Sequence, residues 1–317
     1  MKILSRLKIV IAIIALTSFT FSCNNNDNPV VDNSITGIAQ TNSNLSILVQ
    51  ALVKADLATT LKGVGPFTVF APTDAAFTAF LKTTPYATLN DVPKDVLTQI
   101  LLNHVVSGSV KSTDLSTGYI KTLAKGTASS TNNLSMYVNT ASGVKLNGVA
   151  TVTTADVMAS NGVIHIVDKV IGLPTIVTHA TANRNFTSLV GALTAAGQPD
   201  FVGILSGTGP FTVFAPTNDA FTALNTELAP GGIAGVSSAN LTKVLKYHVA
   251  NGNVLAASLT EGQMVSTLQT PQTFTVQLTG GAKIKDANNR ISTIIATDVQ
   301  CSNGVIHVLN KVLLPTF

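Results

Sequence analysis

The sequence predicts an α+β fold made of two tandem copies of one domain of about 140 residues. The first observation is an internal repeat: residues 65–77 (GPFTVFAPTDAAF) recur at 209–221, and residues 161–170 (NGVIHIVDKV) recur at 303–312. The second is that each copy combines helical periodicity with short runs rich in Val, Thr and Ile. Long matched blocks in the same order exclude a solenoid of short repeats.

Each copy is predicted to open with an amphipathic helix. Apolar residues stand at the spacing i, i+3, i+4 and i+7, which places them on one face of a helix. These residues are Leu45, Leu48, Val49 and Leu52 in the first copy, and Phe186, Leu189, Val190 and Leu193 in the second.

The next elements of the first copy are a strand and two helices. Residues 66–71 form a short β-rich run that stops at Pro72, and Thr73 is suited to cap the helix that carries Phe77. A further helix is expected from Pro93, which suits a first helical turn, to about Val106. Several strands follow. The last two, at 149–158 and 163–171, flank an Asn-Gly pair that predicts a hairpin.

These motifs resemble the fasciclin, or FAS1, domain family. The block FTVFAPT followed about ninety residues later by NGVIH stands in both copies, and the resemblance covers roughly residues 34–174 and 175–317. It implies two wedge-shaped domains, each a sheet or sandwich of about seven strands with helices packed on one side. It also implies extracellular or cell-surface proteins that mediate adhesion or bind matrix and glycans without catalysis.

The N-terminal segment has the pattern of a secretory signal. Lys2, Arg6 and Lys8 precede a short apolar run, which is shorter than a membrane-spanning helix needs, and Cys23 follows it directly. This arrangement resembles the lipobox of bacterial lipoproteins, although Thr20 stands where that family usually has Leu. We expect a signal peptide at 1–22, then a lipidated Cys23 and a polar tether at 23–33; an ordinary signal peptide with an unmodified Cys23 is the alternative.

Composition excludes two other classes of protein. A hydrophobic fraction of 45% is too high for a disordered chain. The formal net charge of +4 falls to +1 once residues 1–22, with three basic and no acidic residues, are set aside. No basic face for nucleic acid is therefore expected.

The histidines are the first candidate functional residues. Four of the five are shared between the copies, at His104 with His248 and at His165 with His307. His104 and His248 continue apolar helical stripes, so a core role is favoured for both. In the resemblance, a Tyr-His pair at this position is linked to receptor binding in animal members; Tyr247 and His248 match it, whereas Asn103 replaces the tyrosine in the first copy.

A second candidate lies just before the Asn-Gly turn. Asp156, Val157 and Met158 resemble the tripeptide that animal FAS1 proteins use for integrin binding, and Asp298 and Val299 are the second copy's version. The favoured alternative is an aspartate that accepts hydrogen bonds from backbone amides at the turn.

The sequence offers no constellation for catalysis, metal or cofactor. It has no His-x-His or Cys-x-x-Cys spacing, no Gly-x-Ser-x-Gly elbow and no phosphate-binding loop. Cys301 is expected to be a small semi-buried residue.

We therefore expect a non-catalytic, lipid-anchored binding protein. Its partners would be extracellular matrix, polysaccharide or a cell-surface protein, and its location the cell envelope, as an outer-membrane lipoprotein. The alternative is a structural scaffold in the periplasm or outer membrane with no adhesive role of its own.

Overall fold

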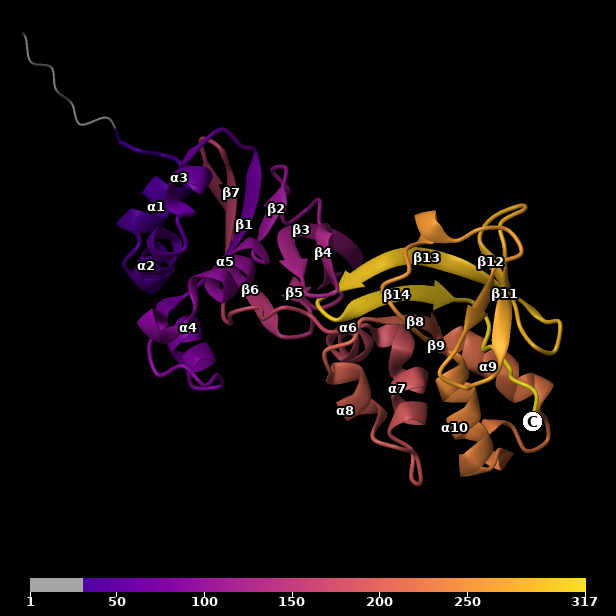
Figure 1. Cartoon of the computed structure of the whole chain (residues 1–317). Helices are drawn as coiled ribbons and strands as arrows, with labels where there is room; N and C mark the ends of the chain where they lie inside the picture. The colour runs from indigo at the N-terminus through magenta and orange to yellow at the C-terminus, as the bar shows by residue number, and fades with distance from the viewer. Residues whose placement is uncertain (1–30) are drawn as a thin grey trace, which may run out of the picture. The chain divides into compact units, whose positions relative to one another are not determined.

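The computed structural model describes residues 31–317, and residues 32–317 form one compact unit (Figure 1). The predicted signal peptide, Cys23 and most of the tether lie outside the described residues. No helix within 31–317 is both long and apolar enough to span a membrane.

The first domain contains five α-helices and seven strands among the described residues. The helices are α1 (Ile35–Thr41), α2 (Ser46–Lys54), α3 (Ala58–Lys62), α4 (Asp74–Leu81) and α5 (Lys94–Leu102). The strands are β1 (Phe67–Pro72), β2 (Val105–Ser107), β3 (Gly118–Gly126), β4 (Ser129–Asn139), β5 (Lys145–Leu146), β6 (Ala150–Ala159) and β7 (Gly162–Val167).

The second domain repeats this order of elements. Its helices are α6 (Ile176–Ala182), α7 (Thr187–Leu193), α8 (Phe201–Ser206), α9 (Asn218–Glu227) and α10 (Ser238–Tyr247). Its strands are β8 (Phe211–Pro216), β9 (Val249–Asn251), β10 (Met264–Ser266), β11 (Thr273–Gln277), β12 (Lys283–Lys285), β13 (Ile291–Cys301) and β14 (Gly304–Leu309).

The two sheets have the same topology. Their strand orders are β3-β4-β5-β6-β7-β1-β2 and β10-β11-β12-β13-β14-β8-β9. The first repeated block forms β1 and β8, the second forms β7 and β14, and these pair in parallel within each domain, Val69 opposite Ile164 and Val213 opposite Ile306. The two signature blocks are therefore neighbouring central strands, which explains why both are rich in buried apolar residues.

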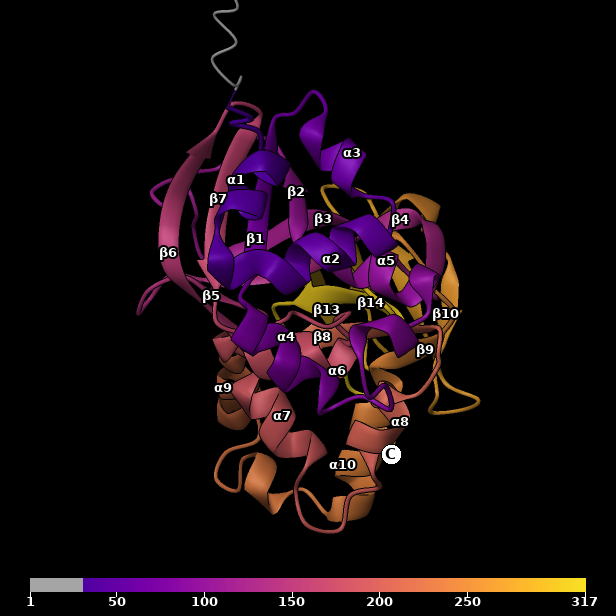
Figure 2. The same cartoon turned by 90° about the vertical axis from the view of Figure 1, so that its left-hand side faces the viewer.

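Each sheet buries apolar side chains on both faces. Helices cover one face, where Leu48, Leu52 and Leu101 pack on the strands of the first domain. The other face holds a separate cluster around Phe70 in the first domain and Phe214 in the second. Figure 2 shows α1, α2 and α4 in front of β1 and β7, and Figure 1 shows α7, α9 and α10 on one side of β8 and β14. The prediction of seven strands with helices on one side is confirmed.

Local signals specify several of these elements. Thr73 caps α4 by accepting a hydrogen bond from the amide of Ala76, as predicted. The Asn-Gly pair turns between β6 and β7, which pair antiparallel. The helix predicted from Pro93 to about Val106 is shorter: α5 ends at Leu102, because Val105 and Val106 pair with β1 as strand β2.

Candidate binding site

His104 and His248 each join the end of a helix to the segment that follows the last strand of its domain. His104 Nδ1 faces the carbonyl oxygen of Ile100 at 2.8 Å, and its Nε2 accepts from the amide of Ile171 at 2.9 Å. His248 makes the same two contacts, with Val244 and Leu313, at the same distances. Because a carbonyl only accepts and an amide N–H only donates, both rings are neutral and protonated on Nδ1.

Burial makes these imidazoles poor acid–base groups. His104 and His248 are 2% and 3% exposed, and burial lowers the pKa of each to about 4. Both ring nitrogens are occupied by the protein backbone. The core role favoured from the helical stripe is therefore what the geometry shows.

The residue before each of these histidines is also buried. The Tyr247 hydroxyl donates to the Thr273 carbonyl at 2.8 Å and accepts from the Ala287 amide at 3.1 Å, and burial raises its pKa to about 12. Asn103 donates through its amide to Gly172 at 3.0 Å instead. Tyr247 and Asn103 thus have the same structural role in the two copies, because each forms hydrogen bonds between the end of its helix and backbone groups distant in the sequence.

His165 and His307 support a bulge in the preceding strand. His165 Nε2 donates to the Val110 carbonyl at 2.9 Å and Nδ1 accepts from the Asp156 amide at 3.2 Å. His307 does the same with Val254 and Asp298. Asp156 and Asp298 have φ of 60° and 56°, a conformation that aspartate tolerates better than most residues, and both lie at register shifts.

The two aspartates differ in how their carboxylates are used. Asp156 accepts from the backbone amide of Ser112 at 2.8 Å and from its hydroxyl at 2.5 Å, and these bonds lower the pKa of Asp156. In the second domain, Ala256 takes the place of Ser112, and Asp298 accepts only from the Ala256 amide, at 2.9 Å, among the described residues.

The remaining tripeptide residues lie in different environments. Val157 is half-buried against the core, whereas Met158 is 55% exposed. Val299 is 3% exposed, and Gln300, which stands where the first copy has Met158, is 1% exposed. Only the first copy presents an apolar side chain to solvent here.

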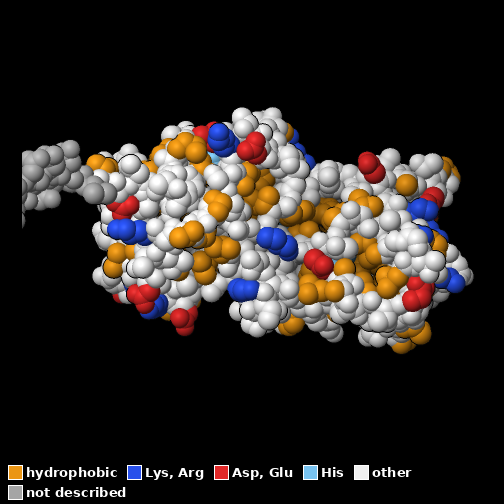
Figure 3. All heavy atoms as spheres, turned by 90° about the horizontal axis from the view of Figure 1, so that it is seen from above, with side chains coloured by type: hydrophobic (Ala, Val, Ile, Leu, Met, Phe, Trp, Pro, Cys, Tyr) orange, Lys and Arg blue, Asp and Glu red, His pale blue; other side chains and the backbone are white. Residues whose placement is uncertain are grey.

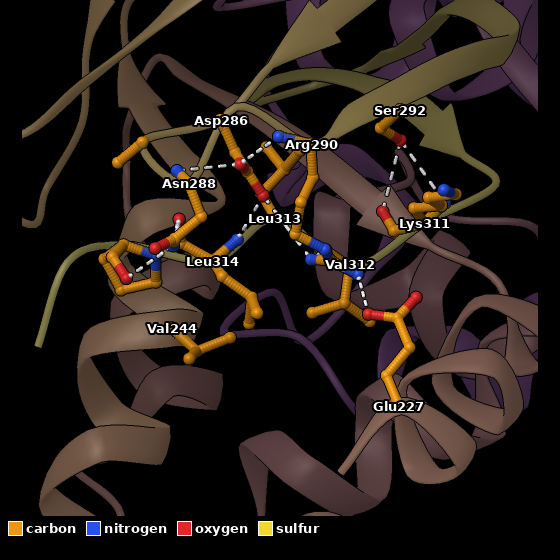
Figure 4. A network of polar contacts seen from close by, with 12 residues as sticks. Glu227, Val244, Asp286, Asn288, Arg290, Ser292, Lys311, Val312, Leu313 and Leu314 are labelled. Carbon is orange, nitrogen blue, oxygen red and sulfur yellow. Dashed lines mark hydrogen bonds and ion pairs between the residues drawn. The ribbon is translucent and has the colours of Figure 1, made fainter.

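The C-terminal segment of the second domain is held by a buried ion pair (Figure 4). Asp286 is 4% exposed and accepts from the amides of Arg290 at 2.9 Å and Leu314 at 3.0 Å. Arg290 donates to the Val312 carbonyl at 2.7 Å and to Glu227 at 2.6 Å. This network fixes the chain on either side of Leu313, the residue whose amide His248 binds.

Sequence reasoning singled out Asp298 but missed the other residues that join the two domains. Lys121 Nζ donates to the backbone carbonyl of Asp298 at 2.7 Å, and Ser135 Oγ accepts from the backbone amide of Gln300 at 3.0 Å. Gly126 lies so close to Ser302 that a Cβ there would be 2.5 Å from its Cα. These residues follow no periodic pattern, so no sequence signal identifies them.

His179, the fifth histidine, also lies at this junction. Its ring packs against that of Tyr119, with the two ring planes at 79°, and the Tyr119 hydroxyl accepts a hydrogen bond from the Asn183 side chain at 3.0 Å. Ile38 occupies the matching place in the first repeat. The sequence did contain a signal for this residue, because His179 is the one histidine without a counterpart in the other repeat.

Two further observations concern the chemistry of the described surface. Within residues 31–317, no group of three or more His, Cys, Asp or Glu side chains could hold a metal ion. Cys301 is fully buried, and burial raises the pKa of its thiol. On the face seen in Figure 3, acidic and basic side chains are scattered among apolar ones rather than gathered by sign.

Comparisons with known proteins agree with this architecture. The model of the fasciclin domain matches residues 43–174 and 184–315. Protein sll1483 of Synechocystis sp. is 43% identical over 143 residues, covering 44% of this chain and 73% of the relative. Human periostin is 29% identical over 268 residues, covering 80% of this chain but only 29% of periostin.

A solved structure shows the same fold. The FAS1 domain pair of the insect cell adhesion molecule fasciclin I superposes with a TM-score of 0.52 at 19% identity, covering 85% of this chain and 96% of that one. Fasciclin domains thus occur in cell adhesion proteins, and they are typically not enzymes. With both domains matched, the chain belongs to the fasciclin domain family and carries two such domains in tandem.

Proposed function

We propose that this protein is a non-catalytic adhesion protein of the cell envelope. The observation that carries the proposal is the pair of fasciclin domains, whose arrangement in one chain also occurs in an insect cell adhesion molecule. Its partners would be extracellular matrix, polysaccharide or a cell-surface protein. Two relatives carry names that fit this class: a fungal fasciclin-like arabinogalactan protein, 29% identical over 171 residues, and the adhesion molecule fasciclin I.

The use of the shared polar residues supports a binding role. The four matched histidines are bonded to the backbone of their own domains, so they hold the two folds rather than a reacting group. Contacts with a partner would then come from exposed side chains. Met158, which is 55% exposed, is one such side chain in the first domain.

The N-terminal sequence supports the proposed location. A basic start, an apolar run and Cys23 fit an exported lipoprotein, with residues 23–33 as a tether between lipid and domains. An anchored chain presents both domains at one surface. Two weak contacts made together would raise the avidity well above that of either domain alone.

The proposal is tested by binding of the fragment 24–317, which retains the compact unit 32–317 whole. The fragment is coated on beads and offered a panel of matrix proteins, neutral and acidic polysaccharides, and intact cells, with beads coated in the heat-denatured fragment as the control. Retention on at least one partner, abolished by denaturation, is the expected result. If the folded fragment binds nothing on the panel and protease added to intact cells does not cut the chain, the scaffold role replaces adhesion.

A further inference from the structure

A cleft lined mainly by polar residues lies where the first domain contacts the second. It has a volume of about 350 Å³, within the range of small-ligand sites. Strands β3 and β4 supply one wall, and β13 with the segment that follows β9 supplies the other. The residues that line it are Lys121, Thr131, Asn132, Asn133, Leu255, Asp298 and Gln300.

Lys121 is a fixed donor in this cleft. Its ammonium donates to Ser135 Oγ at 3.0 Å and to the Asp298 carbonyl at 2.7 Å. An ammonium carries three protons, so one remains for a ligand. Burial lowers the pKa of Lys121, while the nearby carboxylate of Asp298 opposes that change. The side chain is therefore held in place before any ligand arrives, which reduces the entropy cost of binding.

Asp298 supplies an acceptor that its counterpart lacks. Both oxygens of Asp156 are bonded to Ser112, but Asp298 uses only Oδ1, because Ala256 has no hydroxyl. Among the described residues, Oδ2 of Asp298 has no hydrogen-bond partner. Because Ala256 stands where the first domain has Ser112, one carboxylate oxygen of the half-buried Asp298 is left available in the second domain, whereas Asp156 has none in the first.

Asn133 adds a donor and an acceptor on the opposite wall. Its side-chain amide makes no hydrogen bond to any described residue, whereas the neighbouring Asn132 donates to Ser129 Oγ at 2.8 Å. The side chain of Gln300 is not available to a ligand, because its Nε2 already donates to Asn253 Oδ1 and to the backbone carbonyls of Cys301 and Gly304. The groups left for a ligand are therefore one ammonium proton, one carboxylate oxygen and one primary amide; the Thr131 hydroxyl already shares a hydrogen bond with Ser129 Oγ.

We propose that this cleft binds a short stretch of neutral polysaccharide. A sugar hydroxyl both donates and accepts, so it can pair with the ammonium, the carboxylate and the amide alike. Lys121 and Asp298 are the charged residues that line the cleft, and their opposite charges offset each other, so the cleft favours neither an anion nor a cation. The inference rests on the proposed adhesive function and names polysaccharide as its ligand.

The test uses the fragment 24–317 and neutral tetrasaccharides as probes. Cellotetraose, maltotetraose and mannotetraose are titrated by calorimetry, with tetragalacturonate as an anionic probe and triglycine as a zwitterionic one. We expect a neutral tetrasaccharide to bind more tightly than both other probes. Asn133→Ala and Asp298→Asn should each weaken its binding about tenfold, the effect of losing a hydrogen bond to a charged or well-placed group.

Matched variants separate the cleft from the fold and from the function. Asp156→Asn makes the same chemical change in the first domain, outside the cleft, and should bind like the unmodified fragment. If Asn133→Ala and Asp298→Asn are folded by circular dichroism and bind the tetrasaccharide as tightly as the unmodified fragment, the cleft is not the binding site. Tighter binding of tetragalacturonate or triglycine than of every neutral tetrasaccharide would also overturn the proposal. If beads coated with those variants are still retained on polysaccharide, the proposed cleft is wrong and the adhesive function stands. If beads coated with the unmodified fragment are retained on no partner, both proposals are wrong.

Discussion

The imidazole of His179 and the phenol ring of Tyr119 pack in a T-shaped arrangement, with ring centroids 5.4 Å apart, across the contact between the two domains. His179 is fully buried, and neither of its ring nitrogens has a hydrogen-bond partner among the described residues. Burial lowers the pKa of His179 to about 3; the charge of Lys121 acts in the same direction, and the nearby Ser135 backbone only partly opposes them. A neutral ring at this contact makes the stability of the protein sensitive to acid.

Acid should destabilise the protein partly through His179. The unfolded side chain takes up a proton below about pH 6.5, but the folded one does so only near pH 3, so the free energy of unfolding falls as the pH drops through this window. Between pH 6.5 and 5 one such group accounts for about 2 kcal/mol. His179→Ile, which introduces the residue found at this position in the first repeat, should remove this part of the fall in the free energy of unfolding.

Urea unfolding at pH 7 and pH 5 measures this difference. His104 and His248 are also buried with lowered pKa and contribute in the same direction, so the comparison of variant with unmodified protein isolates His179. An identical loss of stability in both proteins would show that His179 is not the group that responds.

Removing the carboxylate of Asp286 should be strongly destabilising. It would leave the Arg290 guanidinium without its most buried partner and the Leu314 amide without an acceptor. Arg290 keeps Glu227 as a partner, so the loss comes mainly from the buried backbone amides left without an acceptor, each of which costs about 1–3 kcal/mol. We expect Asp286→Ala to lower the free energy of unfolding by about 3 kcal/mol in urea, against little change for Asp95→Ala on exposed helix surface. A loss below about 1 kcal/mol would contradict the role given to this network.

Gly126→Ala should loosen the contact between the domains. The added Cβ would meet the backbone of Ser302, which cannot move aside as a flexible side chain can. Overpacking of this kind costs about 1–3 kcal/mol. Hydrogen exchange should become faster in β4 and at the turn before Gly304. Gly172→Ala, where a Cβ meets nothing within 4 Å, is the control; equal exchange in both variants would argue against a close contact.

The proposed anchor depends on one side chain. If Cys23 is lipidated, cells supplied with a labelled fatty acid should incorporate label into the full-length chain, and Cys23→Ala should abolish it and release the protein from the membrane fraction. Cys301→Ala is the matched control, because that thiol is buried within the second domain and should not affect labelling. Label that persists in Cys23→Ala would refute the lipoprotein assignment.

Much of each domain could be predicted from local patterns. The two repeated blocks became paired central strands, Thr73 capped its helix, and the Asn161–Gly162 pair formed the turn of a hairpin. The apolar stripe through His104 also indicated a buried ring correctly. In these cases the signal is periodicity or turn chemistry, both of which belong to neighbouring residues.

Contacts between residues far apart in the sequence, including those between the domains, could not be predicted in this way. α5 ended early because Val105 pairs with a strand some 35 residues away, and Lys121 meets Asp298 across 177 positions of sequence. The difference between Asp156 and Asp298 depends on Ser112 and Ala256, each more than forty residues distant. Such relationships arise from the tertiary structure, so local patterns in the sequence do not contain them.

Attachment of intact cells tests the central claim, adhesion through two fasciclin domains, most directly. Cells that produce the full chain are compared with cells that lack it on surfaces coated with the partner identified by the fragment 24–317. The account predicts that attachment falls in cells without the chain, returns when the chain is restored, and is blocked by added fragment. Equal attachment by both kinds of cell, together with no effect of the fragment, would contradict it.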